Sequence, residues 1–231
     1  MNQSDLETAK DIIKIASTAL KWLEPICKPA AEYLGVILRN KLFWRSKNIT
    51  PILQEARAML DRRGSSLNLK GHPRIAVKVI EEGSLVEDSD LQQMWAGILA
   101  SSCTEDGTDE TNLIFVNILA QLSSSQARII RLPFIEGNYS AYQHDGNEYT
   151  VVEKERSELI NYTELPNWGI LKRELDHLGS LGLVSHSLSS NPQHTTIKLH
   201  YYEAALILYA RCQGYTGNLQ QFLLSITNPS I

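Results

Sequence analysis

The N-terminal part of the chain carries an apolar stripe at helical spacing. Apolar residues recur over Leu6–Ile37 at alternating steps of three and four positions, as one face of a helix requires. Proline removes a backbone hydrogen bond from a helix interior, so Pro25 and Pro29 predict a break in the stripe. We expect one helix to end near Leu23 and a second to run from about Pro29 to Arg45.

This stripe has three interpretations. The first is packing against the rest of the chain, and the second is self-association through an N-terminal arm. The third is binding in the plane of a membrane surface, which rests on residues 34–47, where apolar and aromatic side chains stand beside basic ones. The candidate residues for self-association are Leu6, Ile13, Leu20 and Leu23.

The middle third predicts a compact helical core. Ser89 and Gln92 have the spacing of a capping box, in which each side chain bonds the other residue's backbone N–H. Apolar residues follow at helical spacing, so we expect a helix over about 90–102 with Trp95 in the core. A second apolar helix is expected over 112–122, and serines 123–125 offer an N-cap for a short helix through residue 130.

The pattern changes after Pro133, where turn residues surround several tyrosines. A leucine-rich helix ends in a Leu-Gly-Leu-Val sequence, and two strands follow, joined by a polar turn. A helix followed by such a hairpin is the sequence shape of a winged-helix unit. The expected elements are a strand over 149–152, a helix ending near 178–183, strands over 184–188 and 195–202, and a final helix over about 203–213.

Together these patterns predict a mainly α fold with three parts. An N-terminal helical arm spans residues 1–47, a helical core spans 48–133, and a small winged-helix-like α+β region spans 134–231. The chain has 231 residues, of which 43% are hydrophobic and 21% charged, a composition typical of a globular protein and not of a disordered one.

The expected location is the cytoplasm. The start of the chain has the charges of a soluble segment and not the apolar stretch of a signal peptide, and no run approaches the roughly 20 apolar residues of a membrane-spanning helix. Cys27, Cys103 and Cys212 are isolated and odd in number, which favours unpaired thiols in a reducing compartment.

The charges are strongly segregated along the chain although the net charge is only −4. Residues 39–78 hold ten basic residues and two acidic ones, whereas residues 81–110 hold nine acidic residues and no base. One interpretation is that the two segments neutralise each other within the fold or between copies. The other is that the basic face binds phosphate or anionic lipid. The candidate anion or nucleic-acid contacts are Arg39, Lys41, Arg45, Arg62 and Arg63.

The sequence offers no catalytic constellation. Glu174 and His177 could place two ligands on one helix face, but a carboxylate-bridged metal site needs a second such pair. The acidic stretch 105–110 lies beside turn residues and is typical of a solvated loop. Hydrolase, zinc-protease and P-loop motifs are absent from the sequence. We therefore expect no catalytic residue, no cofactor and no metal, and a protein that is not an enzyme.

Three stretches resemble the bacterial Abi-alpha (abortive infection alpha) family, a domain of unknown function linked to phage defence. They are Lys28–Gly35 continuing to Ile49, Glu87–Ser101, and Phe115–Ser123; Gly97 and Ile98 stand where the family often has an Asn-Leu pair. The resemblance covers roughly residues 25–185. Because these motifs are packing signatures of helices, the resemblance implies a fold and an association with defence, and no catalytic residue.

The resulting functional hypothesis is anti-phage defence by a non-enzymatic protein that self-assembles or binds a protein of a defence system. Two alternatives stay open. One is a nucleic-acid-binding winged-helix regulator, which the balanced charges of the expected helix near Lys172 do not favour. The other is an effector in peripheral contact with a membrane through the N-terminal segment.

Overall fold

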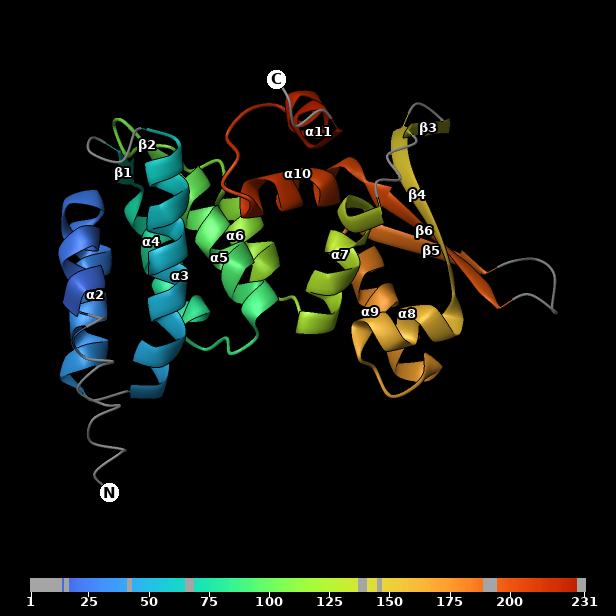
Figure 1. The fold of residues 1–231 in the computed structure, drawn as a ribbon, viewed down its shortest axis with the longest axis horizontal. Helices are drawn as coiled ribbons and strands as arrows, with labels where there is room; N and C mark the ends of the chain where they lie inside the picture. Colours follow the sequence, from blue (N-terminus) through green and yellow to red (C-terminus); the bar gives the residue numbers. More distant parts are fainter. Residues whose placement is uncertain are drawn as a thin grey trace. The chain divides into compact units, whose positions relative to one another are not determined.

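The computed structural model describes residue 14 and residues 17–40, 43–64, 69–136, 141–144, 147–188 and 195–227 (Figure 1). Helices dominate, with small antiparallel sheets, so the predicted mainly α fold is confirmed. Contacts divide the chain into two compact units. Unit 1 comprises Met1–Ala120 with Arg211–Thr216, and unit 2 comprises Gln121–Ala210 with Gly217–Ile231. The three-part division expected from the sequence stays a prediction, since these units are defined by contacts alone.

Unit 1 is a helical assembly in which α3 and α5 run side by side (Figure 1). A helix over residues 17–26 precedes them, and a short antiparallel ladder joins β1 to β2. The elements are α2 (Lys28–Arg39), α3 (Phe43–Arg62), β1 (Lys70–Gly71), α4 (Pro73–Gly83), α5 (Ser89–Ser101), β2 (Cys103–Thr104) and α6 (Leu113–Leu119).

The predicted break between the first two helices is present, but the second helix is shorter than expected. α2 begins at Lys28, with Pro29 in its first turn, where a missing N–H costs no helix hydrogen bond. It ends at Arg39, and a new helix, α3, begins at Phe43, so the prediction of one helix as far as Arg45 was wrong. The spacing of apolar residues predicts a continuous buried face and contains no signal for the turn at Asn40, where α2 ends.

α5 confirms the most specific helix prediction and corrects its cap. Asp88 is the N-cap, and its carboxylate accepts a hydrogen bond from the N–H of Leu91 at 3.0 Å. Ser89 is the first helical residue, and the Gln92 amide donates to the carbonyl of Val86. The capping box predicted at Ser89 was therefore wrong. The carboxylate of the preceding residue caps the helix instead, one position earlier, and it also carries the negative charge that a helix N-terminus favours.

The core of unit 1 surrounds α5 on every side. Trp95 is 1% exposed, as predicted, and the helix is buried continuously from Met94 to Ser101. A helix that is apolar all round is one enclosed by other elements. The returning segment 211–216 approaches α5 closely at Gly97, where an added Cβ would meet the carbonyl oxygen of Cys212 at 1.7 Å. Only glycine permits this approach of two backbones.

Unit 2 is built on a four-stranded antiparallel sheet in the order β3-β4-β6-β5 (Figure 1). β5 has the predicted bounds, β6 and α10 agree to within a residue, and β4 is longer than predicted. Neither α8 nor α11 was expected. The elements are α7 (Ser124–Glu136), β3 (Ala141–His144), β4 (Asn147–Glu155), α8 (Arg156–Thr163), α9 (Trp168–Ser180), β5 (Val184–Leu188), β6 (Thr196–Tyr202), α10 (Glu203–Cys212) and α11 (Leu219–Thr227).

The sheet and α7 are joined by a buried hydrogen bond. Tyr201 on β6 is 0% exposed, and its hydroxyl donates to the carbonyl of Ile129 on α7 at 2.8 Å. Burial raises the pKa of this phenol well above its ordinary value, so the hydroxyl stays protonated and remains a donor. A stacked pair, Phe134 and Tyr209, with Phe222 beside it, joins α7, α10 and α11.

Candidate functional site

The candidate basic residues have partners inside unit 1. Arg45 donates from Nε to Ser84 Oγ and from an Nη to the carbonyl of Glu81, both at 2.8 Å. Arg63 donates to the carbonyl of Ala100 at 3.0 Å. The other candidates are Arg62, paired with Glu55 at 2.9 Å, Arg39, which is exposed, and Lys41, which lies outside the described residues. These contacts support structural roles for Arg45 and Arg63, and anion binding at the five positions stays a prediction.

Among the described residues, an ion pair joins the basic segment to the acidic one. Arg74 pairs with Glu110 at 2.9 Å, and His72 lies 3.4 Å from the same carboxylate. The interpretation that the two segments neutralise each other within the fold is thus supported at this place. Such exposed pairs contribute about 0–1 kcal/mol, so they balance charge more than they stabilise the fold.

The N-terminal stripe packs into its own unit over the described part. Leu23 is 0% exposed and belongs to the core, and Leu20 is half-buried. Leu6 and Ile13 lie outside the described residues, so self-association through the arm stays a prediction. The residues of the stripe from Leu23 onward that are buried are Leu23, Cys27, Ala30, Leu34 and Ile37.

The segment behind the membrane interpretation is partly enclosed over its described residues. Leu34 and Ile37 are buried, whereas Val36 and Trp44 are 42% and 50% exposed. The apolar face of α2 is therefore occupied by the core of unit 1, and Val36 and Trp44 are the exposed apolar side chains among the described residues of this segment. Among the described helices, none combines the length and the apolar character needed to cross a bilayer.

The acidic loop has an internally bonded carboxylate. The Asp106 side chain accepts hydrogen bonds from the hydroxyl and the N–H of Thr108 and from the hydroxyl of Thr104, which lower its pKa to about 2. These bonds form a turn within the loop. The described residues include no group of three or more acidic, histidine or cysteine side chains placed to hold a metal ion.

Glu174 and His177 do lie on one face of α9, but they face α7. The Ser123 hydroxyl donates to the Glu174 carboxylate at 2.9 Å. The buried Gln126 amide lies 2.8 Å from His177 Nδ1 and donates to the carbonyl of Glu174 at 3.3 Å. Since the amide nitrogen can only donate, Nδ1 is the acceptor of this hydrogen bond. This arrangement attaches one helix to the other.

Ser123 and Gln126 also form a capping box at the start of α7. The N–H of Ser123 donates to the Gln126 side chain at 3.0 Å, and the N–H of Gln126 donates to the Ser123 hydroxyl at 3.3 Å. The serines at 123–125 were expected to supply an N-cap, and they do. No local pattern indicates that the same two side chains contact α9, whose partner residues lie 51 positions further along the chain.

The three cysteines are buried and unpaired, as the sequence predicted. Burial raises the pKa of each thiol, and that of Cys103 reaches about 12. A thiol in this state supplies almost no thiolate at neutral pH, so none of the three has the properties of a nucleophile.

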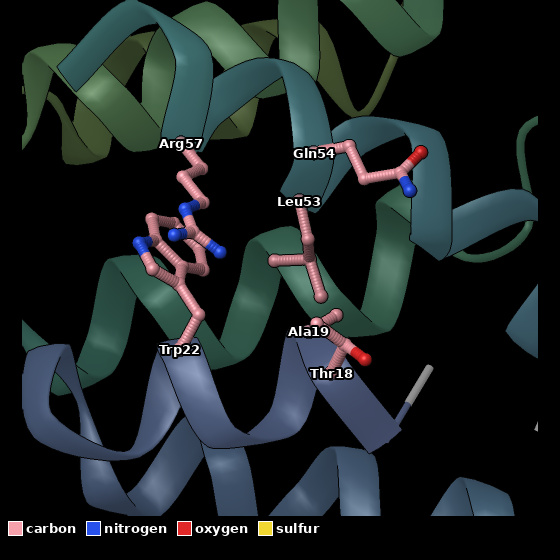
Figure 2. A pocket seen from close by; sticks show the side chains of 6 residues that line it. All are labelled: Thr18, Ala19, Trp22, Leu53, Gln54 and Arg57. Atoms are coloured by element: carbon pink, nitrogen blue, oxygen red, sulfur yellow. The ribbon is translucent and has the colours of Figure 1, made fainter. Parts of the chain in front are cut away.

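A pocket opens in unit 1 between the helix over residues 17–26 and α3 (Figure 2). Its volume is about 220 Å³, and its lining is mainly apolar. Figure 2 shows side chains of both helices directed into the space between them. The lining residues are Thr18, Ala19 and Trp22 from the first helix and Leu53, Gln54 and Arg57 from α3.

The sequence analysis did not single out this pocket. Ala19 and Trp22 stand next to the stripe residues Leu20 and Leu23 and are not members of the stripe. The periodic pattern therefore does not mark them as residues of a pocket. Arg57 belongs to the basic segment, but only the packing of α3 against the first helix places it beside Trp22. Arg57 lies 3.7 Å from Asp61, and both side chains are about half exposed.

A second pocket, of about 270 Å³, lies in unit 2 beside α7, β4 and α8. Glu136 and Lys154, which form an ion pair, both line it. Its lysine is thus already paired with a carboxylate, Glu158 is a further acidic residue of the lining, and these groups do not form a nucleophile-and-base pair.

Comparison with known proteins gives one match. A family model described as abortive infection alpha matches residues 49–215, well over half of the chain. No curated protein and no solved structure matches the chain. The matched region includes the Trp95 helix and the stretch 115–123, and it extends beyond residue 185 to the segment that returns to unit 1. The proline-containing stretch at residues 28–35, which also resembles the family, lies before the matched region. The chain therefore belongs to the abortive infection alpha family.

Proposed function

We propose that this chain acts in anti-phage defence by abortive infection, in which an infected bacterial cell is sacrificed before phage is released. The family match over residues 49–215 carries this proposal. The proposed site of action is the cytoplasm, where a reducing environment keeps buried thiols such as Cys212 unpaired.

The proposed mode of action is non-enzymatic and works through self-assembly or binding of a protein partner. Glu174 and His177 are the side chains that best resembled catalytic groups. Their hydrogen bonds hold α9 against α7, and this structural role supports a non-enzymatic mode of action. The pocket between the helix over residues 17–26 and α3 has a mainly apolar lining with Thr18, Gln54 and Arg57 as its polar groups, a composition that suits a contact with another protein.

Unit 2 fits a winged-helix-like interpretation. α7, β4, α8 and α9 precede the β5–β6 hairpin, and β6 pairs with both β4 and β5. The turn expected to form the wing, residues 189–194, lies outside the described residues. Many such units bind proteins and never contact DNA, so the fold alone does not decide the partner.

The charges on α9 argue for a protein-packing role. Lys172 pairs with Asp176 at 2.7 Å, and Arg173 pairs with Glu174 at 3.2 Å. A helix that enters a DNA groove needs cations available to phosphate. We expect the full chain to bind duplex DNA at physiological salt with a Kd of about 1 µM or higher, because about 1 µM is the tightest Kd of ordinary non-specific binding. Tight, salt-dependent binding in a gel-shift assay would favour the regulator alternative.

The defence proposal is tested in bacteria that express the chain and are challenged with a panel of phages. We expect fewer phage per infected cell, together with death of the infected cells, for at least one phage. Glu174→Gln separates the two modes of action, because glutamine still accepts the Ser123 hydrogen bond but lacks the charge of a catalytic carboxylate. Full protection by this variant is expected. Loss of protection in a variant that melts like wild type would revive the enzyme interpretation.

A further inference from the structure

We propose that the Trp22 pocket, defined by the six residues that line it, accepts residues 1–13 of a second copy of this chain. This inference rests on the proposed self-assembly and names the surface that would carry it. The two pocket walls come from different helices, so the pocket is a groove of the kind that receives the apolar side chains of a third helix.

The size of the pocket favours side chains over a free ligand. Its volume of about 220 Å³ is below the roughly 300–1,000 Å³ typical of small-molecule sites. Trp22, which is half-buried, and Leu53, which is buried, provide an apolar surface for a few aliphatic groups. The polar groups Thr18, Gln54 and Arg57 come from both walls, as in a protein contact with an apolar centre and a polar rim.

The charge beside the pocket is positive. An arginine has five N–H donors, so the 3.7 Å contact of Arg57 with Asp61 does not use all of them and leaves donors for another carboxylate. Lys14 and Lys21 are exposed and lie four positions before and three positions after Thr18, which makes them its neighbours on the helix surface. An acidic occupant is therefore favoured.

Residues 1–13 have the matching pattern. Leu6, Ala9 and Ile13 stand at positions i, i+3 and i+7, the spacing of groups that enter a helix groove. The same segment holds three acidic residues and one lysine, which gives its side chains a net charge of −2. The acidic residues are Asp5, Glu7 and Asp11.

The geometry favours a second copy over the segment's own chain. Lys14 is helical and lies only four positions before Thr18, the first pocket residue. To reach its own pocket, the preceding segment would have to reverse direction at once. Two copies can instead exchange segments about a twofold axis, so that each pocket is filled without a reversal.

The test measures the mass of the full chain by light scattering over a range of concentrations. Arg57→Glu replaces attraction by repulsion and is expected to weaken association by about tenfold or more. Arg62→Glu is the matched control, because Arg62 is also an exposed α3 arginine paired with a carboxylate of the same helix, but it does not line the pocket. This control is expected to associate like wild type.

A charge exchange makes the test specific. Glu7→Lys combined with Asp11→Lys is expected to give monomers alone. Mixing this variant with Arg57→Glu is expected to restore association, because both contacts of the mixed dimer are then complementary, one with reversed charges and one as in wild type. Thermal melts establish that each variant is folded. If wild type is monomeric at every concentration, both the self-assembly proposal and this inference fail. If wild type assembles and folded Arg57→Glu assembles equally well, self-assembly stands and the Trp22 pocket is overturned as its surface.

Discussion

Replacing Gly97 by alanine is expected to detach the returning segment from α5. An ideal Cβ at this position lies 1.7 Å from the carbonyl oxygen and 2.1 Å from the carbonyl carbon of Cys212. Real Cβ atoms essentially never approach other heavy atoms to less than 3.0 Å, so one backbone has to move by more than 1 Å. Both obstructing atoms belong to the backbone, so no side-chain rotation relieves the clash.

The expected cost follows from two opposing effects. Alanine is favoured over glycine in a helix interior by up to about 1 kcal/mol. Overpacking a well-packed core costs about 1–3 kcal/mol and occasionally more. Gly214 is also closely packed, since a Cβ built there would lie 3.1 Å from Met59 Sδ, and movement of Cys212 disturbs this packing. The packing cost is therefore expected to dominate. We expect Gly97→Ala to lower the free energy of unfolding by about 1–3 kcal/mol.

Gly35→Ala is the matched control. Gly35 is also inside a helix, α2, but nothing lies within 4 Å of a Cβ placed there. The helix propensity of alanine is then unopposed, and we expect a gain of about 0.5–1 kcal/mol. The two substitutions add the same methyl group and are predicted to change stability in opposite directions.

Denaturant unfolding gives the stability of each variant, and amide hydrogen exchange followed by mass spectrometry locates the change. In Gly97→Ala, faster exchange is expected in residues 211–216 and in α5. In Gly35→Ala these segments are expected to exchange as in wild type. Wild-type stability and wild-type exchange in Gly97→Ala would refute the close approach of α5 and Cys212.

Three other predictions follow from burial. Trp95→Ala is expected to cost about 3–5 kcal/mol, and an unchanged denaturation midpoint would mean that the indole is not enclosed. The three buried thiols, including Cys103 with its pKa of about 12, are expected to react with a thiol reagent only after unfolding; rapid labelling of the native chain would contradict this. Burial lowers the pKa of His186 and His200 below 6.5, so protonation favours the unfolded chain. Stability is therefore expected to fall as the pH drops below about 6.5, and less so in His186→Asn; equal unfolding midpoints at pH 7.5 and 5.5 would exclude this effect.

Local signals in the sequence determined several elements almost to the residue. β5 was predicted over 184–188, and the structure has it there, because a glycine-rich helix end and a polar turn delimit a short run with strand propensity. α5 was predicted to within a residue at each end, since its apolar positions and its N-terminal cap lie in one continuous stretch. The family could likewise be recognised from helix-packing motifs around Trp95.

The choice between neighbouring caps depended on tertiary structure. Asp88 and Ser89 are both suitable N-caps by residue type, and the fold uses Asp88 while Gln92 bonds to Val86. The capping box appears instead at Ser123, where the same side chains also contact α9. A local pattern states which groups can form a cap, whereas the packed neighbours decide which of them does.

The candidate site depended entirely on contacts between distant parts of the chain. The Trp22 pocket exists because α3 packs beside the first helix, and the Gly97 contact exists because residues more than 100 positions later return to unit 1. Periodicity identifies the buried face of a helix, but it does not identify the partner of that face. The partner is set by the packing of the whole unit, because apolar burial is non-directional and close packing alone selects among the possible neighbours.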